Sequence, residues 1–482
     1  MTHYDLAIIG SGSGNSLPGP AWADKKVAVL DGGTFGGTCL NVGCIPTKMF
    51  VYPADLAAGT REAGRLGVDA EVRNVHWRAI RDRIFDRIDP ISAGGKEYRQ
   101  HGNPNTTLYA EDAHFTGPNE LSTTSGARIT AADIVVAAGS RPVLPDFEGN
   151  DLPQVHTSDT VMRIDELPGR VLIVGGGFIA AEFGHIFSSF GSEVTVVTRS
   201  GGMLKSQDAE ISQRFEDQVR RNWTVRHGYQ VASVRPLDRR DQPGQQVSSS
   251  GPVTVELTPS AGFPSEATTL TVDLVLLATG RRPNTDRLGL EATGFDVHAD
   301  GRLSVDAFQR VLASGRPVKG VWALGDISSP FELKHVANHE ARTVAHNLLA
   351  PSELRASDHR FVPAAVFTRP QIASVGMTEL QARQHARGQG RQIVTAVQNY
   401  GTTAYGWAME DTSGVVKLIA GKEDGQLLGA HIMGHEASLL IQPLVQAMSF
   451  GLDVKTMATG QYWIHPALTE VVENALLALE VD

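Results

Sequence analysis

The chain has only two cysteines, Cys39 and Cys44, and both lie in the short segment 36–48, Gly-Gly-Thr-Cys-Leu-Asn-Val-Gly-Cys-Ile-Pro-Thr-Lys. A secreted domain held by disulfides carries more cysteines spread along its length, and a structural zinc site needs further ligands nearby. In a reducing cytosol, a lone close pair favours thiol–disulfide chemistry. Spacing alone also leaves open two unrelated buried thiols, because free cysteine is frequently buried.

The residues after Cys44 bear on how reactive its thiol is. Cys44 stands at the start of an expected helix that continues through Lys48. A helix N-terminus favours negative charge and lowers the pKa of a thiol, so it can hold a thiolate. In exchange with a disulfide, the attacking thiol needs a base and the departing thiol needs a proton. The sequence offers 16 histidines for that role.

Two segments share a second chemical pattern, an apolar strand run followed by a glycine turn and the start of a helix. They cover residues 7–15 and 171–182, and further apolar strands follow at 27–30 and 194–197. Such glycines let the turn close tightly and bring the backbone to a pyrophosphate at a helix N-terminus. Two copies in this context predict two nucleotide sites. The glycines concerned are Gly10, Gly12 and Gly14 in the first copy, and Gly175 and Gly177 in the second.

The two copies differ in detail. Asn15 stands where the first copy would have its third glycine, so the packing of helix on strand is expected to differ there. The strand at 27–30 ends in Asp31, an acid placed to hydrogen-bond a ribose hydroxyl. The strand at 194–197 instead leads to Arg199 and Lys205. Cations there suit a 2′-phosphate and favour NADP over NAD, although a solvated surface arginine is the alternative.

Length and composition limit the class of protein. At 482 residues the chain is expected to form several domains. The formal net charge of -10 argues against nucleic acid as a partner, which normally meets a basic face. No apolar run is long enough for a transmembrane helix, and no secretory signal precedes the first strand. A cytoplasmic location without membrane contact is therefore expected.

Further elements can be read from the rest of the chain. Apolar strands end in glycine at Gly139 and Gly280, and a third ends in Ala-Leu-Gly-Asp at Asp326. Residues 235–270 are rich in Pro, Gly, Ser, Gln and Thr, which predicts a hairpin with a long tip. Beyond residue 350 there is no nucleotide fingerprint, and strand-like runs mix with apolar helical stretches. This part is expected to be a separate α+β domain.

Segment 36–48 resembles the active-site segment of the flavin-dependent pyridine nucleotide–disulfide oxidoreductases, and the resemblance covers essentially the whole chain. It implies an α/β fold with two Rossmann-like dinucleotide-binding domains plus an α+β C-terminal dimerisation domain. The implied boundaries are 1–155 and 275–348 for FAD binding, 156–274 for NAD(P)H binding and 349–482 for dimerisation. FAD and NADPH are the implied cofactors.

The resemblance also implies roles for the redox groups. Cys39 would be the exposed interchange thiol that attacks the substrate disulfide, and Cys44 the flavin-facing thiolate that resolves the mixed disulfide. The family places its base in a His-Pro pair with a Glu five residues beyond, which His465 and Glu470 match. They would act on the partner subunit's cysteines in an obligate homodimer. A His-Pro pair on an ordinary surface loop is the alternative.

Other positions follow from the same resemblance. Lys48 and Glu182 would form an ion pair beside the flavin, although Glu182 could equally be an ordinary acid in the first turn of a helix. Phe178 would block the nicotinamide pocket until NADPH displaces it. The expected cofactor contacts are Gly37, Thr38, Gly139, Asp326 on the FAD ribityl chain, and Gly280, with Gly177 and Ala180 packed against the NADPH diphosphate.

The lack of a third cysteine and a closer resemblance to one branch of the family narrow the range of possible substrates. The chain ends Leu-Glu-Val-Asp without a third cysteine, so electrons must leave from Cys39 to a small disulfide that enters the cleft. The family branch that reduces mycothione, the disulfide of a cysteinyl pseudo-disaccharide thiol, is the most similar. Dihydrolipoamide dehydrogenase remains an alternative, as do a flavin-only NADPH oxidase or quinone reductase and a flavin-binding scaffold without chemistry.

Overall fold

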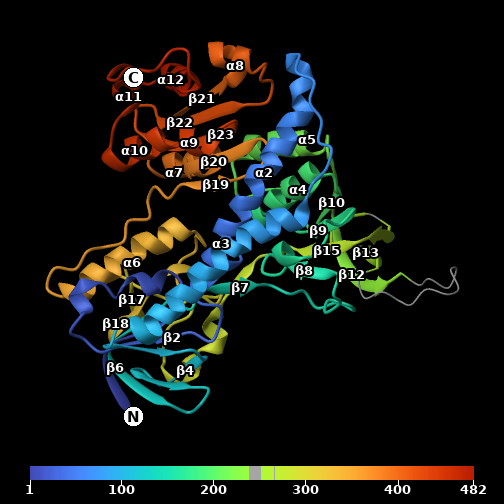
Figure 1. Cartoon of the computed structure of the whole chain (residues 1–482). Helices are drawn as coiled ribbons and strands as arrows, with labels where there is room; N and C mark the ends of the chain where they lie inside the picture. The colour runs from blue at the N-terminus through green and yellow to red at the C-terminus, as the bar shows by residue number, and fades with distance from the viewer. Residues whose placement is uncertain (238–250, 265) are drawn as a thin grey trace, which may run out of the picture. The chain divides into compact units, whose positions relative to one another are not determined.

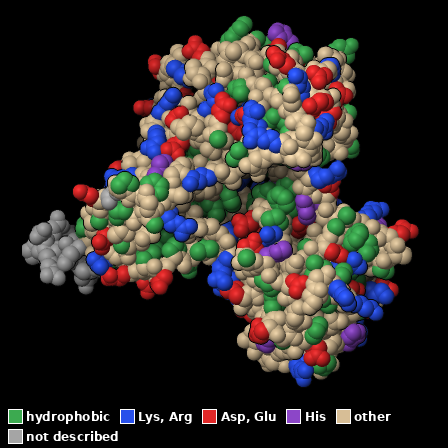
Figure 2. Space-filling model, turned by 180° about the vertical axis from the view of Figure 1, so that it is seen from behind, with side chains coloured by type: hydrophobic (Ala, Val, Ile, Leu, Met, Phe, Trp, Pro, Cys, Tyr) green, Lys and Arg blue, Asp and Glu red, His purple; other side chains and the backbone are tan. Residues whose placement is uncertain are grey.

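The computed structural model describes residues 1–237, 251–264 and 266–482. The chain divides into two compact units built from alternating segments. The first unit comprises Met1–Met49, Arg78–Val143 and Gly280–His359, and the second comprises Phe50–Trp77, Leu144–Thr279 and Arg360–Asp482. None of the helices in the described part of the chain is long and apolar enough to cross a membrane. The face drawn in Figure 2 carries acidic and basic side chains interspersed.

The first unit is organised around β1 (Thr2–Ile9), whose residues 6–9 are apolar and buried. It pairs in parallel with β2 (Val27–Leu30) on one side and β6 (Arg128–Val136) on the other. Ile8 faces Val29 and Val135 across these ladders. The sheet is completed by β3 (Thr106–Tyr109), the hairpin β4 (Ala113–Gly117) and β5 (Glu120–Thr123), β18 (Arg316–Ala323) and β17 (Arg310–Ala313).

The connection from β1 to β2 departs from the sequence expectation. A helix was expected after the first glycine turn, but the chain forms two short 3₁₀ helices, η1 (Ser13–Ser16) and η2 (Pro20–Trp22). Two prolines within four residues break a longer helix, since proline lacks an N–H and restricts the residue before it. Asn15 is held here by Arg99, whose Nε donates to the side-chain oxygen at 2.8 Å.

Both cysteines lie in helices. Cys39 lies in α1 (Gly37–Asn41), and Cys44 is the first residue of α2 (Cys44–Glu62). Both α2 and α3 (Trp77–Glu97) contain residues of each unit. The cysteine pair belongs to the first unit, because both cysteines lie in its segment Met1–Met49. The first unit also contains α6 (Lys334–Leu349), the π-helical turn η4 (Tyr98–Gly102), and the short strand pair β7 (Ser140–Pro142) and β16 (Arg281–Pro283).

The second unit contains a five-stranded parallel sheet in the order β11-β10-β9-β15-β8. Here the glycine turn is followed by a full helix, α4 (Phe178–Phe190), as expected. The remaining bounds are β8 (Val155–Thr157), β9 (Arg170–Val174), β10 (Glu193–Thr198), α5 (Ala209–Val219), β11 (Trp223–His227) and β15 (Leu274–Leu277). Two sheets with parallel strands and glycine turns confirm the two Rossmann-like folds.

The expected hairpin is present in the second unit. Strand β12 (Tyr229–Pro236) pairs antiparallel with β13 (Val253–Pro259), which pairs with β14 (Thr268–Val272). Val253, Val255 and Leu257 alternate toward a buried cluster, because successive strand residues face opposite sides. The long tip at 238–250 lies outside the described residues.

The C-terminal part forms an antiparallel sheet in the order β19-β20-β23-β22-β21, with helices packed against it (Figure 1). Its strands are β19 (Ala364–Val366), β20 (Gln371–Gly376), β21 (Ile393–Asn399), β22 (Val415–Gly421) and β23 (Leu427–Gly434). The helices are α7 (Glu379–Gly388), α8 (Ala404–Ala408), α9 (Ala437–Leu440), α10 (Gln442–Phe450), α11 (Val454–Thr459) and α12 (Glu470–Leu477). The expected α+β architecture is confirmed, whereas the exact three-domain boundaries stay a prediction.

Candidate redox-active site

The two cysteines lie in consecutive helices within the first unit, and Cys44 is the first residue of its helix. Both are free thiols, and a hydrogen bond joins them. That hydrogen bond and burial raise the pKa of the Cys39 thiol, while the positive charge of Lys334 acts in the opposite direction. Removal of the proton from Cys39 during attack on a disulfide therefore calls for a base. Negative charge is best placed on Cys44, where the N-terminus of α2 favours it.

Cys39 lies inside the short helix α1 and is partly exposed, whereas Cys44 is the first residue of α2. Partial exposure of Cys39 is compatible with attack on a substrate disulfide. The assignment of the attacking role to Cys39 and the resolving role to Cys44 stays a prediction.

Side chains that the sequence did not single out hold the cysteine segment in place. Asn41 is buried and donates from Nδ2 to the carbonyl oxygens of Phe35 and Gly37, each at 3.0 Å. Ser92 on α3 donates to the same Phe35 oxygen at 2.5 Å. A buried asparagine beside two cysteines was the available signal, because buried polar groups are hydrogen-bonded.

The first glycine turn has the close approaches that a dinucleotide site needs. A Cβ on Gly10, whose φ is 106°, would lie 2.3 Å from the oxygen of Ala137. Gly14 is equally constrained, since its Cβ would lie 2.9 Å from Ile8, so it provides the close packing expected of a third glycine. A Cβ on Gly37 would lie 2.7 Å from the Cα of Gly12. These positions tolerate only glycine.

Asp31 lies at the carboxyl end of β2, as expected. Its Oδ2 accepts from the backbone N–H of Ser11 in the glycine turn at 2.7 Å, and its Oδ1 accepts from Gly33 at 2.8 Å. The acid therefore orders the turn and stays half-exposed beside it. Glycine turn and acid together fit the pyrophosphate and ribose of FAD.

Asp326 lies in the 3₁₀ helix η8 (Gly325–Ile327), which follows β18. Its Oδ2 accepts from Ser140 Oγ at 2.6 Å. Glu340 on α6 is buried and accepts the backbone N–H of Gly325 at 2.7 Å. Two other expected cofactor contacts, Gly139 and Gly280, have positive φ and open space where a Cβ would be. Thr38, a third expected contact, lies in α1. The polar contacts of Asp326 fit a hydroxylated cofactor chain, and sequence reasoning missed Ser140 and Glu340.

The second glycine turn lies between β9 and α4. A Cβ on Gly175 would lie 2.1 Å from the oxygen of Ala278, so this position also requires glycine. Gly177 caps α4 and has open space around it. Ala180 needs a correction, because it is fully buried and cannot touch a diphosphate. Its small side chain instead lets α4 pack into the core of the unit.

The two cations expected at the 2′-phosphate lie in the loop between β10 and α5. Arg199 and Lys205 are both exposed. The loop is fixed by backbone contacts, because the N–H of Leu204 donates to the oxygen of Gly176 in the glycine turn at 2.7 Å. Exposed cations on an ordered loop fit the binding of an anionic group.

His465 and Glu470 are brought together as expected. The Nδ1–H of His465 donates to Oε1 of Glu470 at 2.6 Å. The His465 side chain is 70% exposed and the Glu470 side chain 18%. The ring is thereby oriented with Nε2 available for proton transfer. Oε2 of Glu470 is buried and has no hydrogen-bond partner in the described part of the chain.

The remaining expected positions are accounted for individually. Glu182 is buried in α4, and its Oε1 accepts the backbone N–H of Phe367 at 3.1 Å. Phe178, the first residue of that helix, is exposed. Lys48 lies on α2 in the first unit and Glu182 in the second, so their ion pair stays a prediction.

Comparison with known proteins agrees with this site. Residues 4–341 match the pyridine nucleotide-disulphide oxidoreductase family, and residues 362–476 match its dimerisation domain. Mycothione reductase from Mycobacterium tuberculosis is 51% identical, with 99% of this chain and 100% of the relative covered. Glutathione reductase from Burkholderia cepacia is 30% identical, with 97% of each chain covered. The HOCl-induced flavoprotein disulfide reductase RclA from Escherichia coli superposes with a TM-score of 0.81 at 25% identity, with 99% of each chain covered.

The chain therefore belongs to the pyridine nucleotide-disulphide oxidoreductase family. It is an FAD-dependent disulfide oxidoreductase with NADPH as its second cofactor, and it carries the family's dimerisation domain.

Proposed function

We propose that the chain reduces mycothione to mycothiol with NADPH and so maintains the thiol redox balance of the cell. The observation that carries this proposal is the difference in identity between relatives. The mycothione reductase is 51% identical over nearly the whole chain, whereas glutathione reductase and a dihydrolipoyl dehydrogenase from Staphylococcus aureus are both 30% identical. All three relatives are covered over nearly their whole length, so the higher identity is what favours mycothione as the substrate.

In the proposed mechanism, Cys39 attacks one sulfur of the substrate disulfide. A mixed disulfide forms, the first substrate thiol departs, and the proton of Cys39 passes to that thiol through the imidazole of His465. Cys44 then attacks the sulfur of Cys39, which releases the second thiol and leaves a Cys39–Cys44 disulfide. The second thiol takes its proton from solvent. When bound, FAD would supply the electron pair that, together with one proton, returns the disulfide to the Cys39 thiol and the Cys44 thiolate.

Glu470 orients the base in this scheme. Its hydrogen bond holds the proton on Nδ1 of His465, so that Nε2 presents a lone pair to the reacting sulfurs.

We further propose that these sulfurs belong to the partner subunit of a homodimer. Tyr462 and Ile464 beside the base are 104% and 74% exposed. Large apolar side chains exposed together around a catalytic base are typical of a subunit interface.

NADPH is proposed to bind through Arg199 and Lys205 at its 2′-phosphate. Replacing both with methionine should raise the KM for NADPH about 100-fold, as expected for two lost charge-assisted contacts of about 1.5 kcal/mol each. The KM for NADH should change less than about twofold, because NADH has no 2′-phosphate to lose contact with. Steady-state kinetics with both nucleotides checks this, and equal loss with both would contradict it.

The substrate proposal is tested by following NADPH oxidation by the FAD-loaded enzyme against mycothione, glutathione disulfide and lipoamide, with NADH in parallel. Mycothione is expected to give a kcat/KM at least about 100-fold above the other two, because a site that hydrogen-bonds sugar hydroxyls discriminates against disulfides lacking them. Preferred turnover of lipoamide with NADH would identify a dihydrolipoyl dehydrogenase instead. Turnover of quinones or oxygen alone would identify a flavin-only oxidase. A cytoplasmic location stays a prediction.

A further inference from the structure

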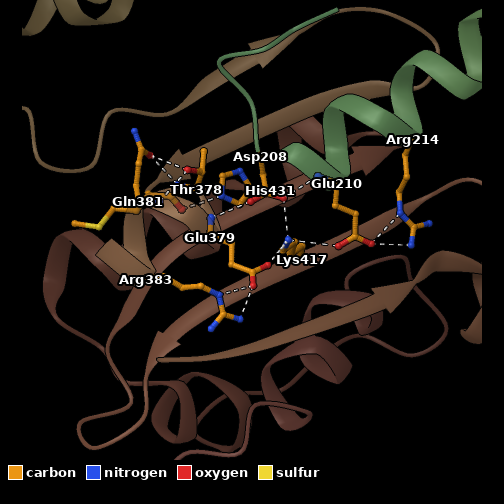
Figure 3. A network of polar contacts seen from close by, with 10 residues as sticks. Asp208, Glu210, Arg214, Thr378, Glu379, Gln381, Arg383, Lys417 and His431 are labelled. Atoms are coloured by element: carbon orange, nitrogen blue, oxygen red, sulfur yellow. Dashed lines mark hydrogen bonds and ion pairs between the residues drawn. The ribbon is translucent and has the colours of Figure 1, made fainter. Parts of the chain in front are cut away.

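A buried lysine in the C-terminal sheet contacts three carboxylates. Lys417 lies in β22, and its side chain is 6% exposed. Its Nζ lies 2.8 Å from Oδ1 of Asp208, 2.7 Å from Oε2 of Glu379 and 3.4 Å from Oε2 of Glu210 (Figure 3). Val416 and Leu418 on either side belong to the apolar core, so strand alternation directs Lys417 to the opposite face of the sheet.

Burial and charge pairing act in opposite directions on Lys417. Burial by itself would lower the pKa of Lys417, but hydrogen bonds to Asp208 and Glu379 outweigh it, and the pKa is raised. The hydrogen bond from Lys417 also holds the pKa of Glu379 below its usual range. Burial lowers the pKa of the neighbouring His431, which therefore stays neutral. Because a buried ion pair is weak evidence for stability, its value is better sought in what it orients.

Asp208 is the residue through which the cluster acts on the nucleotide sheet. It caps α5, since its Oδ1 accepts the backbone N–H of Glu210 at 3.2 Å. Its Oδ2 accepts the N–H of Glu379, the first residue of α7, at 2.9 Å. One carboxylate thus joins the start of a helix from the nucleotide fold to the start of a helix from the C-terminal domain, with Lys417 between them.

The start of α5 in turn sets the position of the preceding loop. The Oγ of Ser212 donates to the oxygen of Leu204 at 2.7 Å, and Oε2 of Glu216 accepts the N–H of Met203 at 3.1 Å. The N–H of Leu204 reaches Gly176 in the glycine turn. Arg199 and Lys205 lie in this same loop, between β10 and α5. A shift of α5 therefore moves both cations relative to the nucleotide.

We propose that Lys417 is a positioning residue for the 2′-phosphate end of NADPH, acting through Asp208 and α5 on the loop that carries Arg199 and Lys205. The inference rests on the proposed role of those two cations. It makes selectivity for the phosphorylated nucleotide depend on the C-terminal domain, although no residue of that domain needs to touch the nucleotide.

The test uses the FAD-loaded dimer and two probes, adenosine 2′,5′-bisphosphate and 5′-AMP, titrated by calorimetry. Lys417→Met should weaken binding of the bisphosphate about tenfold and change binding of 5′-AMP less than about twofold. Lys422→Met, the same substitution just beyond the end of β22 and outside the cluster, is the matched control and should bind both probes like the parent. Equal weakening of both probes, or none, would overturn the inference.

A second variant guards against misfolding of Lys417→Met, which leaves the buried Asp208 without its cation. Glu379→Gln can keep its oxygen toward Lys417 while it removes the charge and the acceptor that Arg383 contacts, and it should weaken binding of the bisphosphate alone by about threefold. If it binds both probes like the parent, the inference fails. The proposed 2′-phosphate site fails separately, if the double Arg199→Met and Lys205→Met variant retains its affinity for the bisphosphate.

Discussion

Cys44→Ser is expected to abolish disulfide turnover, with a loss of more than about 10³-fold, the scale seen when a covalent nucleophile is removed. NADPH oxidation that uses only the flavin, with a quinone or oxygen as acceptor, should persist. The physical reason is that a serine hydroxyl cannot resolve a mixed disulfide. Steady-state assays with both classes of acceptor check this result, and complete loss of the quinone activity would indicate misfolding or lost FAD instead.

The same variant decides which cysteine attacks. Incubated with substrate disulfide, Cys44→Ser should accumulate a mixed disulfide on Cys39, visible by mass spectrometry, because the second step is blocked. Cys39→Ser is the matched control and should form far less adduct. The test matters because the hydrogen bond to Cys44 raises the pKa of Cys39, the thiol expected to attack. An adduct formed preferentially on Cys44 would reverse the assigned roles.

Strong local patterns made much of the fold predictable. The second glycine turn follows an apolar strand and is followed by an uninterrupted helix and a second apolar strand. The structure has β9, α4 and β10 at these places. The first turn shares the glycines, but Pro18 and Pro20 follow closely, and the helix is replaced by 3₁₀ turns. The glycine pattern alone predicted a helix here, and this prediction was wrong because it left the two prolines out of account.

The site was predictable where chemistry is local in sequence. His465 lies five residues before Glu470, which is the first residue of α12. This short spacing is enough to predict their contact. Ser140 and Asp326 meet only because β6 and β18 are neighbours in the sheet. Asp208, Glu379 and Lys417 each look like ordinary surface charges in the sequence. Their cluster depends on tertiary packing that no local pattern encodes.

Burial also separated two small residues that look alike in the sequence. Gly177 and Ala180 both follow the second glycine turn and were both expected at the NADPH diphosphate. The structure leaves open space around Gly177, which caps the start of α4, and it buries Ala180 in the first turn of that helix. A fingerprint position therefore indicates a nucleotide fold more reliably than it indicates a contact.

Loss of the base should be nearly as severe as loss of a cysteine. His465→Gln is expected to lower disulfide turnover by about 10²–10⁴-fold, the usual contribution of a positioned acid or base. Glu470→Gln should cost less, because the amide can still accept from Nδ1 through its oxygen. Stopped-flow reduction of the enzyme by NADPH provides the reference, since that step does not involve the imidazole. Slow reduction by NADPH in His465→Gln would point to a structural defect.

Whether the base serves its own cysteines or those of its partner can be decided by mixing two inactive variants. If the site is shared, a dimer of one Cys39→Ser chain and one His465→Gln chain holds one site with both wild-type groups and one with neither. Two-fold symmetry permits no other assignment for a shared site. Co-expressed at random, about half of the dimers are mixed and each has one intact site of two, so about a quarter of wild-type activity should return. If each chain used its own histidine, every site would lack one group and no activity would return. Purifying the mixed dimers through two different tags sharpens the contrast to about half of wild-type activity against none. The exposed His465 and the exposed apolar residues beside it favour the shared site.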